Sequence, residues 1–168
     1  MAAVPAIPAS MECKRHVSSF VSVMDMTLSR GRQVLASQPF NAWLAAELLM
    51  FGGGYAEISV PIRRDLTQQG GAAHDSVVSH AAGSALAFAG ASLLGFEVAL
   101  AEFKINYLRP VMGDALTARG AVLHVGGIQV VCRCDVFARQ GGGVVHCAAA
   151  QGTLTRRSVS ARIETSVE

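Results

Sequence analysis

The stretch from residue 66 to residue 109 constrains the fold most strongly, because it contains a helix that has almost no polar face. A glycine-rich loop at residues 68–74 leads into about twenty residues dominated by Ala, Ser, Gly and Val, and then into an alternating segment. Apolar side chains on nearly every side predict a buried helix rather than a surface helix. Their small size would let a sheet wrap closely around it. The apolar positions are Val77, Val78, Ala81, Ala82, Ala85, Leu86, Ala89 and Leu93.

The remaining periodic segments are typical of strands. Two apolar runs flank three consecutive glycines at residues 52–54, as expected for a hairpin. After the helix come four segments of roughly ten residues each, in which apolar and polar side chains alternate. The pattern predicts an α+β fold in which an antiparallel sheet of about six strands curls around one long helix. The six expected strands are Leu44–Phe51, Tyr55–Ile62, Val98–Arg109, Ala115–Val125, Ile128–Arg139 and Val144–Leu154.

The two ends of the chain differ in character from this central part. Apolar spacing from Glu12 to about Ser37 favours a helix, so residues 1–37 are interpreted as a partly helical N-terminal extension. Pro39 limits further helix, and a single turn is expected at Phe40–Trp43. Residues 38–157 are expected to form one domain, and residues 158–168 are expected to be a flexible tail.

Composition excludes several classes of function. A formal net charge of +2 over 168 residues is too small to suggest binding to nucleic acid or to an anionic membrane surface. The first basic residues, Lys14 and Arg15, follow the apolar run, which is the reverse of a secretory signal. No apolar segment reaches the roughly 18 residues that a membrane span requires. We therefore expect a soluble, cytoplasmic protein.

The cysteines do not indicate a metal site. Their spacing is not that of a zinc centre, and two of them share one face of an expected strand. We interpret all four as reduced thiols of a protein that needs no metal. They are Cys13, Cys132, Cys134 and Cys147.

Several short motifs occur in a fixed order along the chain. They are Leu66-Thr67-Gln68-Gln69, His74, Val77-Val78, the segment EFKINYLRP at residues 102–110, and Gly113-Asp114. In this order they resemble the hotdog-fold acyl-CoA thioesterases, most closely the PaaI type of the 4-hydroxybenzoyl-CoA thioesterase superfamily. The resemblance covers about residues 40–156. It implies an acyl-CoA thioesterase that releases the free acid and CoA, assembles as a homodimer or homotetramer, and uses no cofactor beyond the CoA of its substrate.

The resemblance also implies a catalytic site, and here this sequence departs from the family. In the family, an Asn or Gln precedes a His-Gly-Gly motif by six residues, backbone amides at the helix start bind the thioester, and the helix carries an acid. The amide side chain falls on Gln68 and the histidine on His74. The two glycines are replaced by Asp75 and Ser76, and the acid position falls on Gly83.

Two other side chains are candidates for the missing base. Asp75 lies about 12 Å along the helix axis from Gly83, and its carboxylate is expected to accept amide hydrogens of the first turn instead. His80 is nearer, because it precedes Gly83 by three residues on the same helix face. It is also the kind of histidine that is often satisfied within a packed interface. Both remain candidates for the catalytic group.

For CoA, the resemblance implies a groove lined by residues 107–112 and 125–128, with arginines near its phosphates. The expected binding residues are Tyr107, Leu108, Arg109, Gly126, Gly127, Arg156 and Arg157. The glycine at position 83 keeps a second function open, that of a non-catalytic acyl-CoA-binding protein. A hydratase of the same fold is not supported, because the chain has no Asp-x-Asn-Pro-x-x-His pattern.

Overall fold

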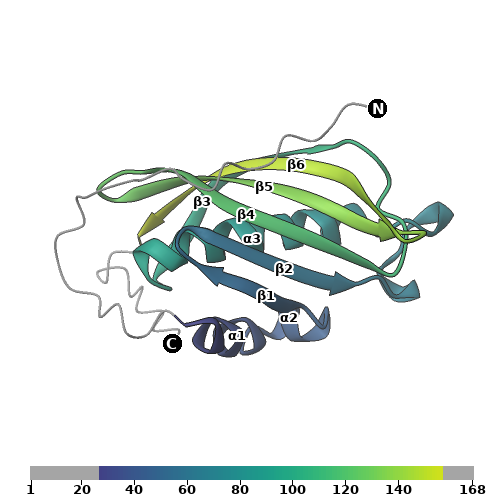
Figure 1. Cartoon of the computed structure of the whole chain (residues 1–168), viewed down its shortest axis with the longest axis horizontal. Coiled ribbons are helices and arrows are strands. Elements are labelled where there is room, and N and C mark those ends of the chain that lie inside the picture. The colour runs from purple at the N-terminus through teal and green to yellow at the C-terminus, as the bar shows by residue number, and fades with distance from the viewer. Residues whose placement is uncertain (1–26, 157–168) are drawn as a thin grey trace, which may run out of the picture.

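The computed structural model describes residues 27–156 of the chain (Figure 1). The expected N-terminal helix is therefore seen only in its last part, as α1 (Leu28–Ala36), and the expected single turn is α2 (Pro39–Trp43). Cys13, Arg157 and the expected tail at residues 158–168 lie outside the described residues. The proposed division of the chain into extension, domain and tail stays a prediction.

Six antiparallel strands form one sheet that curls around the long helix α3 (Asp75–Leu94), so the expected α+β hotdog architecture is confirmed (Figure 1). The strand order across the sheet is β1-β2-β4-β5-β6-β3. Two short 3₁₀ turns, η2 (Arg64–Leu66) and η3 (Gln69–Gly71), connect the first hairpin to α3. The strands are β1 (Glu47–Gly52), β2 (Tyr55–Pro61), β3 (Val98–Tyr107), β4 (Ala115–Val125), β5 (Gln129–Gln140) and β6 (Gly143–Arg156).

α3 is the centre of the hydrophobic core, as its small apolar side chains indicate. Ala81, Ala82, Ala85 and Leu86 are fully buried against the concave face of the sheet. Contact with β4 is closest at Gly120, where an added β-carbon would overlap the carbonyl oxygen of Ala85. The helix and the sheet therefore meet backbone to backbone at this point.

The expectation that no segment is long enough to span a membrane is wrong for α3. By length and composition alone this helix could cross a bilayer, because its many small residues are still apolar on average. However, 67% of its most apolar window is buried inside the fold. Its apolarity is thus accounted for by its place in the core.

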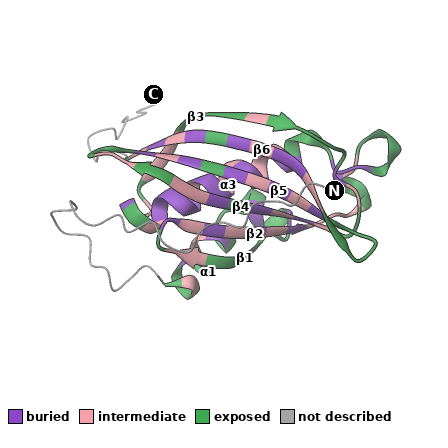
Figure 2. Cartoon of the chain, turned by 45° about the horizontal axis from the view of Figure 1, so that its top comes forward, coloured by how far each residue is buried: buried purple, intermediate pink, exposed green. Residues whose placement is uncertain are grey.

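β3 is the exposed edge of the sheet (Figure 2). Among residues 27–156 it pairs only with β6, and most of its residues are exposed although several are apolar. Phe103 and Tyr107 lie opposite Gly152 and Ala148, which belong to the buried face of β6. These two residues nevertheless remain 36% and 47% exposed in the single chain. Val98, Leu100 and Ile105 pack against the core, so the inner face of β3 is left partly uncovered at Phe103 and Tyr107.

The opposite edge, β1, is partly covered by a helix. α1 lies alongside β1 (Figure 1), and the Nε atom of Arg32 donates a hydrogen bond of 2.9 Å to the backbone carbonyl of Leu48. Gly31 is buried against Leu48 and Phe51, and its lack of a side chain lets the helix approach the strand closely. A polar group on the outer edge of β1 is therefore satisfied by the helix.

Three of the four cysteines are described, and all three are free thiols in the core. Burial raises the pKa of Cys132 and of Cys134 to about 12. Because the thiolate is the reactive form, these two thiols are unreactive near neutral pH.

Candidate active site

The loop before α3 is tightly folded, and this fixes the backbone of Gln68. The amide of Gln68 donates to the carbonyl of Ala72 at 2.8 Å, and the amide of Gly71 donates back to the carbonyl of Gln68 at 3.1 Å. Gly70 and Gly71 have positive φ angles of 82° and 81°, a conformation that glycine adopts without strain. The glycines at residues 70–71 thus give the loop the turn that brings Gln68 to the start of the helix.

The N-cap of α3 is His74, so the expected capping role of Asp75 is wrong. The Nδ1 atom of His74 accepts the backbone amide of Ser76 at 3.1 Å and lies 2.7 Å from the Ser76 hydroxyl. An imidazole nitrogen here takes the place of the usual hydroxyl or carboxylate oxygen. Asp75 is instead the first helical residue, and its carboxylate is free to point elsewhere.

A cavity of about 700 Å³ opens between this loop, the first turn of α3 and the segment after β3. Its volume lies in the range of small-molecule sites. The phenol of Tyr107 donates to the carbonyl of Asp75 at 3.3 Å, which joins the end of β3 to the helix start. The lining residues are Gln68, Gln69, Gly70, Ala72, Ala73, Asp75, Val78, Tyr107, Leu108, Arg109, Pro110, Val111 and Met112.

The most direct polar contact in the cavity joins Gln68 to Asp75. The Nε2 atom of Gln68 donates to Oδ1 of Asp75 at 3.2 Å and to the carbonyl of Ala73 at 3.4 Å. Both hydrogens of the amide are thereby used in this structure. Gln68, on which the amide side chain of the implied catalytic site falls, binds the carboxylate of Asp75 here.

Gly83 lies outside the set of residues that line the cavity. A β-carbon added at this position would have one near neighbour, Cδ2 of Leu100 at 3.6 Å, so the site has room for a side chain. Position 83, which the sequence resemblance aligns with the family's acid, thus has no side chain and is bordered by an apolar strand residue.

His80 is tied to α2 rather than directed into the cavity. Its Nε2 atom lies 2.8 Å from Oδ1 of Asn41 and 3.3 Å from the hydroxyl of Ser84. Because an amide oxygen only accepts, Nε2 carries the proton in this contact. Phe40 packs edge-on against the ring at 4.6 Å, and burial lowers the pKa of His80. This is the arrangement of a satisfied structural histidine.

The environment of His80 predicts a pH-dependent stability. Its pKa in the folded chain lies below the unfolded value of about 6.5, so the unfolded chain takes up the proton first as the pH falls. This contribution is complete above pH ~6.5 and is lost below it. Denaturant midpoints measured between pH 5 and 8 should therefore fall on the acid side, and His80→Gln should flatten that slope.

His124→Gln is the matched control, because His124 is an exposed histidine on β4. Its acid-side slope should equal that of the unmodified chain. Equal slopes for both variants would show that His80 is not the group that links protonation to unfolding.

The expected CoA-binding residues divide into two groups within one chain. Tyr107, Leu108 and Arg109 line the cavity, and one nitrogen of the Arg109 guanidinium donates to the carbonyl of His146 at 3.0 Å. The turn at residues 126–127 and Arg156 lie together at the other end of the sheet, where the amide of Arg156 bonds to the carbonyl of Ile128. Val98, which pairs with Arg156, is nine positions from Tyr107 along β3. The two groups of residues are therefore roughly 30 Å apart within one chain.

Sequence reasoning missed the contribution of α2 to this region. Asn41 is 1% exposed and connects His80 to Gln38, whose Oε1 accepts from Nδ2 of Asn41 at 2.5 Å. A lone asparagine in a short helical turn carries no motif, so its burial depends on how α2 packs against α3. Gln38 and Asn41 are three positions apart, but Asn41 and His80 are 39 positions apart. A periodic sequence pattern does not indicate a contact between residues so far apart in the chain.

The chain is similar to known proteins in both sequence and structure. The family model described as the thioesterase superfamily matches residues 70–145. No curated protein matches the chain. A thioesterase family protein of Silicibacter pomeroyi is 32% identical, with 77% of this chain and 97% of that chain covered and a TM-score of 0.72.

Two more distant structures share the fold. A thioesterase of Haemophilus influenzae is 24% identical, with 82% of this chain and 94% of that chain covered and a TM-score of 0.70. The PaaI protein of the phenylacetic acid degradation operon of E. coli is 20% identical, with 79% and 97% covered and a TM-score of 0.63.

Proposed function

Because the chain belongs to the thioesterase superfamily, we propose that it hydrolyses an acyl-CoA thioester to the free acid and CoA. The observation that carries this proposal is the cavity at the start of α3, where polar groups of the loop and the helix face an otherwise largely apolar lining. Such a cavity suits a substrate with an apolar acyl group and one reactive carbonyl.

The helix start supplies a donor for that carbonyl. The amide of Ser76 donates to the side chain of His74. The amides of Val77 and Val78 donate to the backbone carbonyl of His74. Within residues 27–156, the amide of Asp75 has no such acceptor. A thioester oxygen accepting from it would lie at the positive end of the helix, where the negative charge of the tetrahedral intermediate is stabilised.

A homodimer would complete the CoA groove. If two β3 edges paired antiparallel about a two-fold axis, the Tyr107 end of one chain would lie beside the Val98 end of its partner. The glycine turn and Arg156 of the partner would then approach the cavity. The exposure of Phe103 and Tyr107 on the inner face of β3 supports this arrangement. The Arg109 and Arg156 side chains would flank the CoA phosphates.

A second function, non-catalytic binding of acyl-CoA, is favoured by one observation. Position 83 offers no side chain, and its neighbour across the gap is the apolar Leu100. A site that lacks the acid of its relatives could retain the groove and lose the chemistry.

One experiment separates the two functions. Release of CoA thiol is followed over a panel of acyl-CoAs that differ in chain length and aromaticity, and binding of CoA itself is measured by calorimetry. We expect both thiol release and binding. Binding without release from any acyl-CoA would favour the non-catalytic function, and the absence of both would contradict the two together.

A further inference from the structure

The cavity contains one carboxylate, and it is not where the family would place it. Among the lining residues Asp75 is the sole acid, and its carboxylate is relieved of capping because His74 performs that role. The other ionisable groups of the lining, Tyr107 and Arg109, are engaged with backbone carbonyls. Asp75 is thus the one side chain in the lining whose chemistry and contacts suit a general base.

The structure also holds this carboxylate in a defined direction. Oδ1 accepts from Gln68 at 3.2 Å, and Gln68 is itself fixed by its second bond to the carbonyl of Ala73. The backbone of Asp75 is held by the phenol of Tyr107 at 3.3 Å. Oδ2 makes no hydrogen bond to any described residue, so it is the oxygen that remains available in the cavity.

We propose that Asp75 is the general base of the hydrolysis, in place of the acid that is absent at Gly83. The inference rests on the proposed thioesterase function. The carboxylate of Asp75 need not reach position 83. A thioester carbonyl bound by the backbone amide of Asp75 would lie beside the carboxylate of the same residue. Gln68 is a positioning residue that keeps Oδ1 occupied and leaves Oδ2 toward the water.

The reaction balances with water as the only co-reactant. Oδ2 of Asp75 removes a proton from the water molecule as the water oxygen bonds to the thioester carbon. The carbonyl oxygen of the thioester becomes an oxyanion at the helix start. When the oxyanion collapses, the carbon–sulfur bond breaks and the thiolate of CoA leaves with the electron pair. The proton held by Asp75 passes to that thiolate, which restores the carboxylate.

The alternative bases are less well placed. Nδ1 of His74 is used by the amide and hydroxyl of Ser76. His80 is bound to Asn41, and neither histidine lines the cavity. Asp75 is therefore better placed than either histidine to act as the base.

Asp75→Asn is the test, because the asparagine oxygen can still accept from Gln68 while the group loses its basicity. We expect kcat to fall by about 10²–10⁴-fold, with KM, CoA affinity and the melting temperature little changed. If this variant does not fold, Asp75→Ser removes the carboxylate at the same place and is judged by the same split between kcat and KM.

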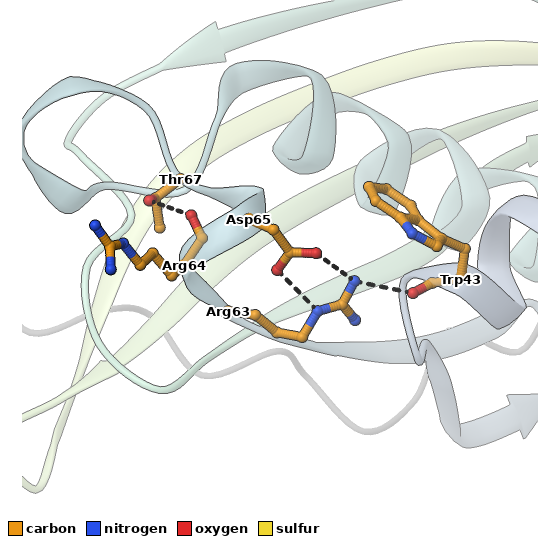
Figure 3. Close-up of polar contacts among 5 residues, drawn as sticks. All are labelled: Trp43, Arg63, Arg64, Asp65 and Thr67. Carbon is orange, nitrogen blue, oxygen red and sulfur yellow. Dashed lines mark hydrogen bonds and ion pairs between the residues drawn. The ribbon is translucent and has the colours of Figure 1, made fainter.

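Asp65→Asn is the matched control. Asp65 is exposed in a cluster with Arg63 and Trp43, and it does not line the cavity (Figure 3). Its kcat should equal that of the unmodified chain. A kcat of Asp75→Asn within a few-fold of the control would overturn the role of Asp75 and leave the thioesterase function intact. If the unmodified chain released CoA from no acyl-CoA, both proposals would fail.

A single turnover in ¹⁸O-labelled water tests whether Asp75 acts instead as a nucleophile whose mixed anhydride is hydrolysed at the aspartyl carbon. With Asp75 as base, the product acid of the first turnover carries the label. Unlabelled product with label later found in Asp75 would mean that the carboxylate attacks the carbonyl itself, and would overturn the assignment as a base.

Discussion

Replacing Gly120 with alanine should lower the free energy of unfolding by about 3 kcal/mol or more, at or above the upper end of the usual cost of overpacking. The added methyl group would overlap the carbonyl oxygen of Ala85. A side chain could rotate away, but this oxygen belongs to the backbone of α3, so the whole helix would have to move off the sheet. Urea denaturation, read as a change in midpoint at constant slope, measures the effect.

Gly127→Ala provides the comparison. A β-carbon at Gly127 would have no atom within 4 Å. Its stability should stay the same or rise slightly, because alanine restricts the unfolded chain. If Gly120→Ala were as stable as Gly127→Ala, the close contact between α3 and β4 would not exist in solution.

Introducing a charge at Phe103 should convert the proposed dimer to a monomer and abolish hydrolysis. Phe103 lies on the inner face of β3 and is 36% exposed in the single chain, so Phe103→Glu should be tolerated by the fold. In a paired edge, however, the carboxylate would be buried without a partner, which is strongly unfavourable. Light scattering measures the mass, and release of CoA thiol measures the activity.

The matched change on the other edge is Met50→Glu. Met50 is an apolar residue of β1 with 53% exposure, on the edge that α1 covers. This variant should keep both the mass and the activity of the unmodified protein. A Phe103→Glu variant that remained a dimer would place the interface elsewhere, and an active monomer would show that one chain is sufficient for catalysis.

Most of the fold could be predicted because it depends on local periodicity. The expected strand Ala115–Val125 coincides with β4, and the alternation in β5 places Val130, Cys132 and Cys134 in the core as expected. Ile128, the first residue of the expected strand Ile128–Arg139, is instead 76% exposed, because it lies in the turn before the strand begins. The pairing of β3 with β6 rather than β4 is a non-local choice that alternation does not encode.

The site was less predictable because it depends on side-chain directions. The motif order correctly brought Gln68 and residues 107–109 to one cavity. It could not show that an imidazole caps α3, because His74 achieves this through one particular ring orientation. The Gln68–Asp75 contact depends on this capping by His74, which leaves the Asp75 carboxylate free, and on a loop whose path is determined by Gly70 and Gly71. The burial of Asn41 likewise depends on the packing of two helices.

The cover that α1 places over β1 limits how copies of this chain can assemble. A sheet with two open edges can add further copies at both ends and grow into a fibre. Here Arg32 occupies a carbonyl of Leu48 at one edge, which leaves β3 as the open edge of the described sheet. If two chains pair through β3 as proposed, that edge is used in a single step and a continuous sheet of twelve strands results, twice the six of one chain.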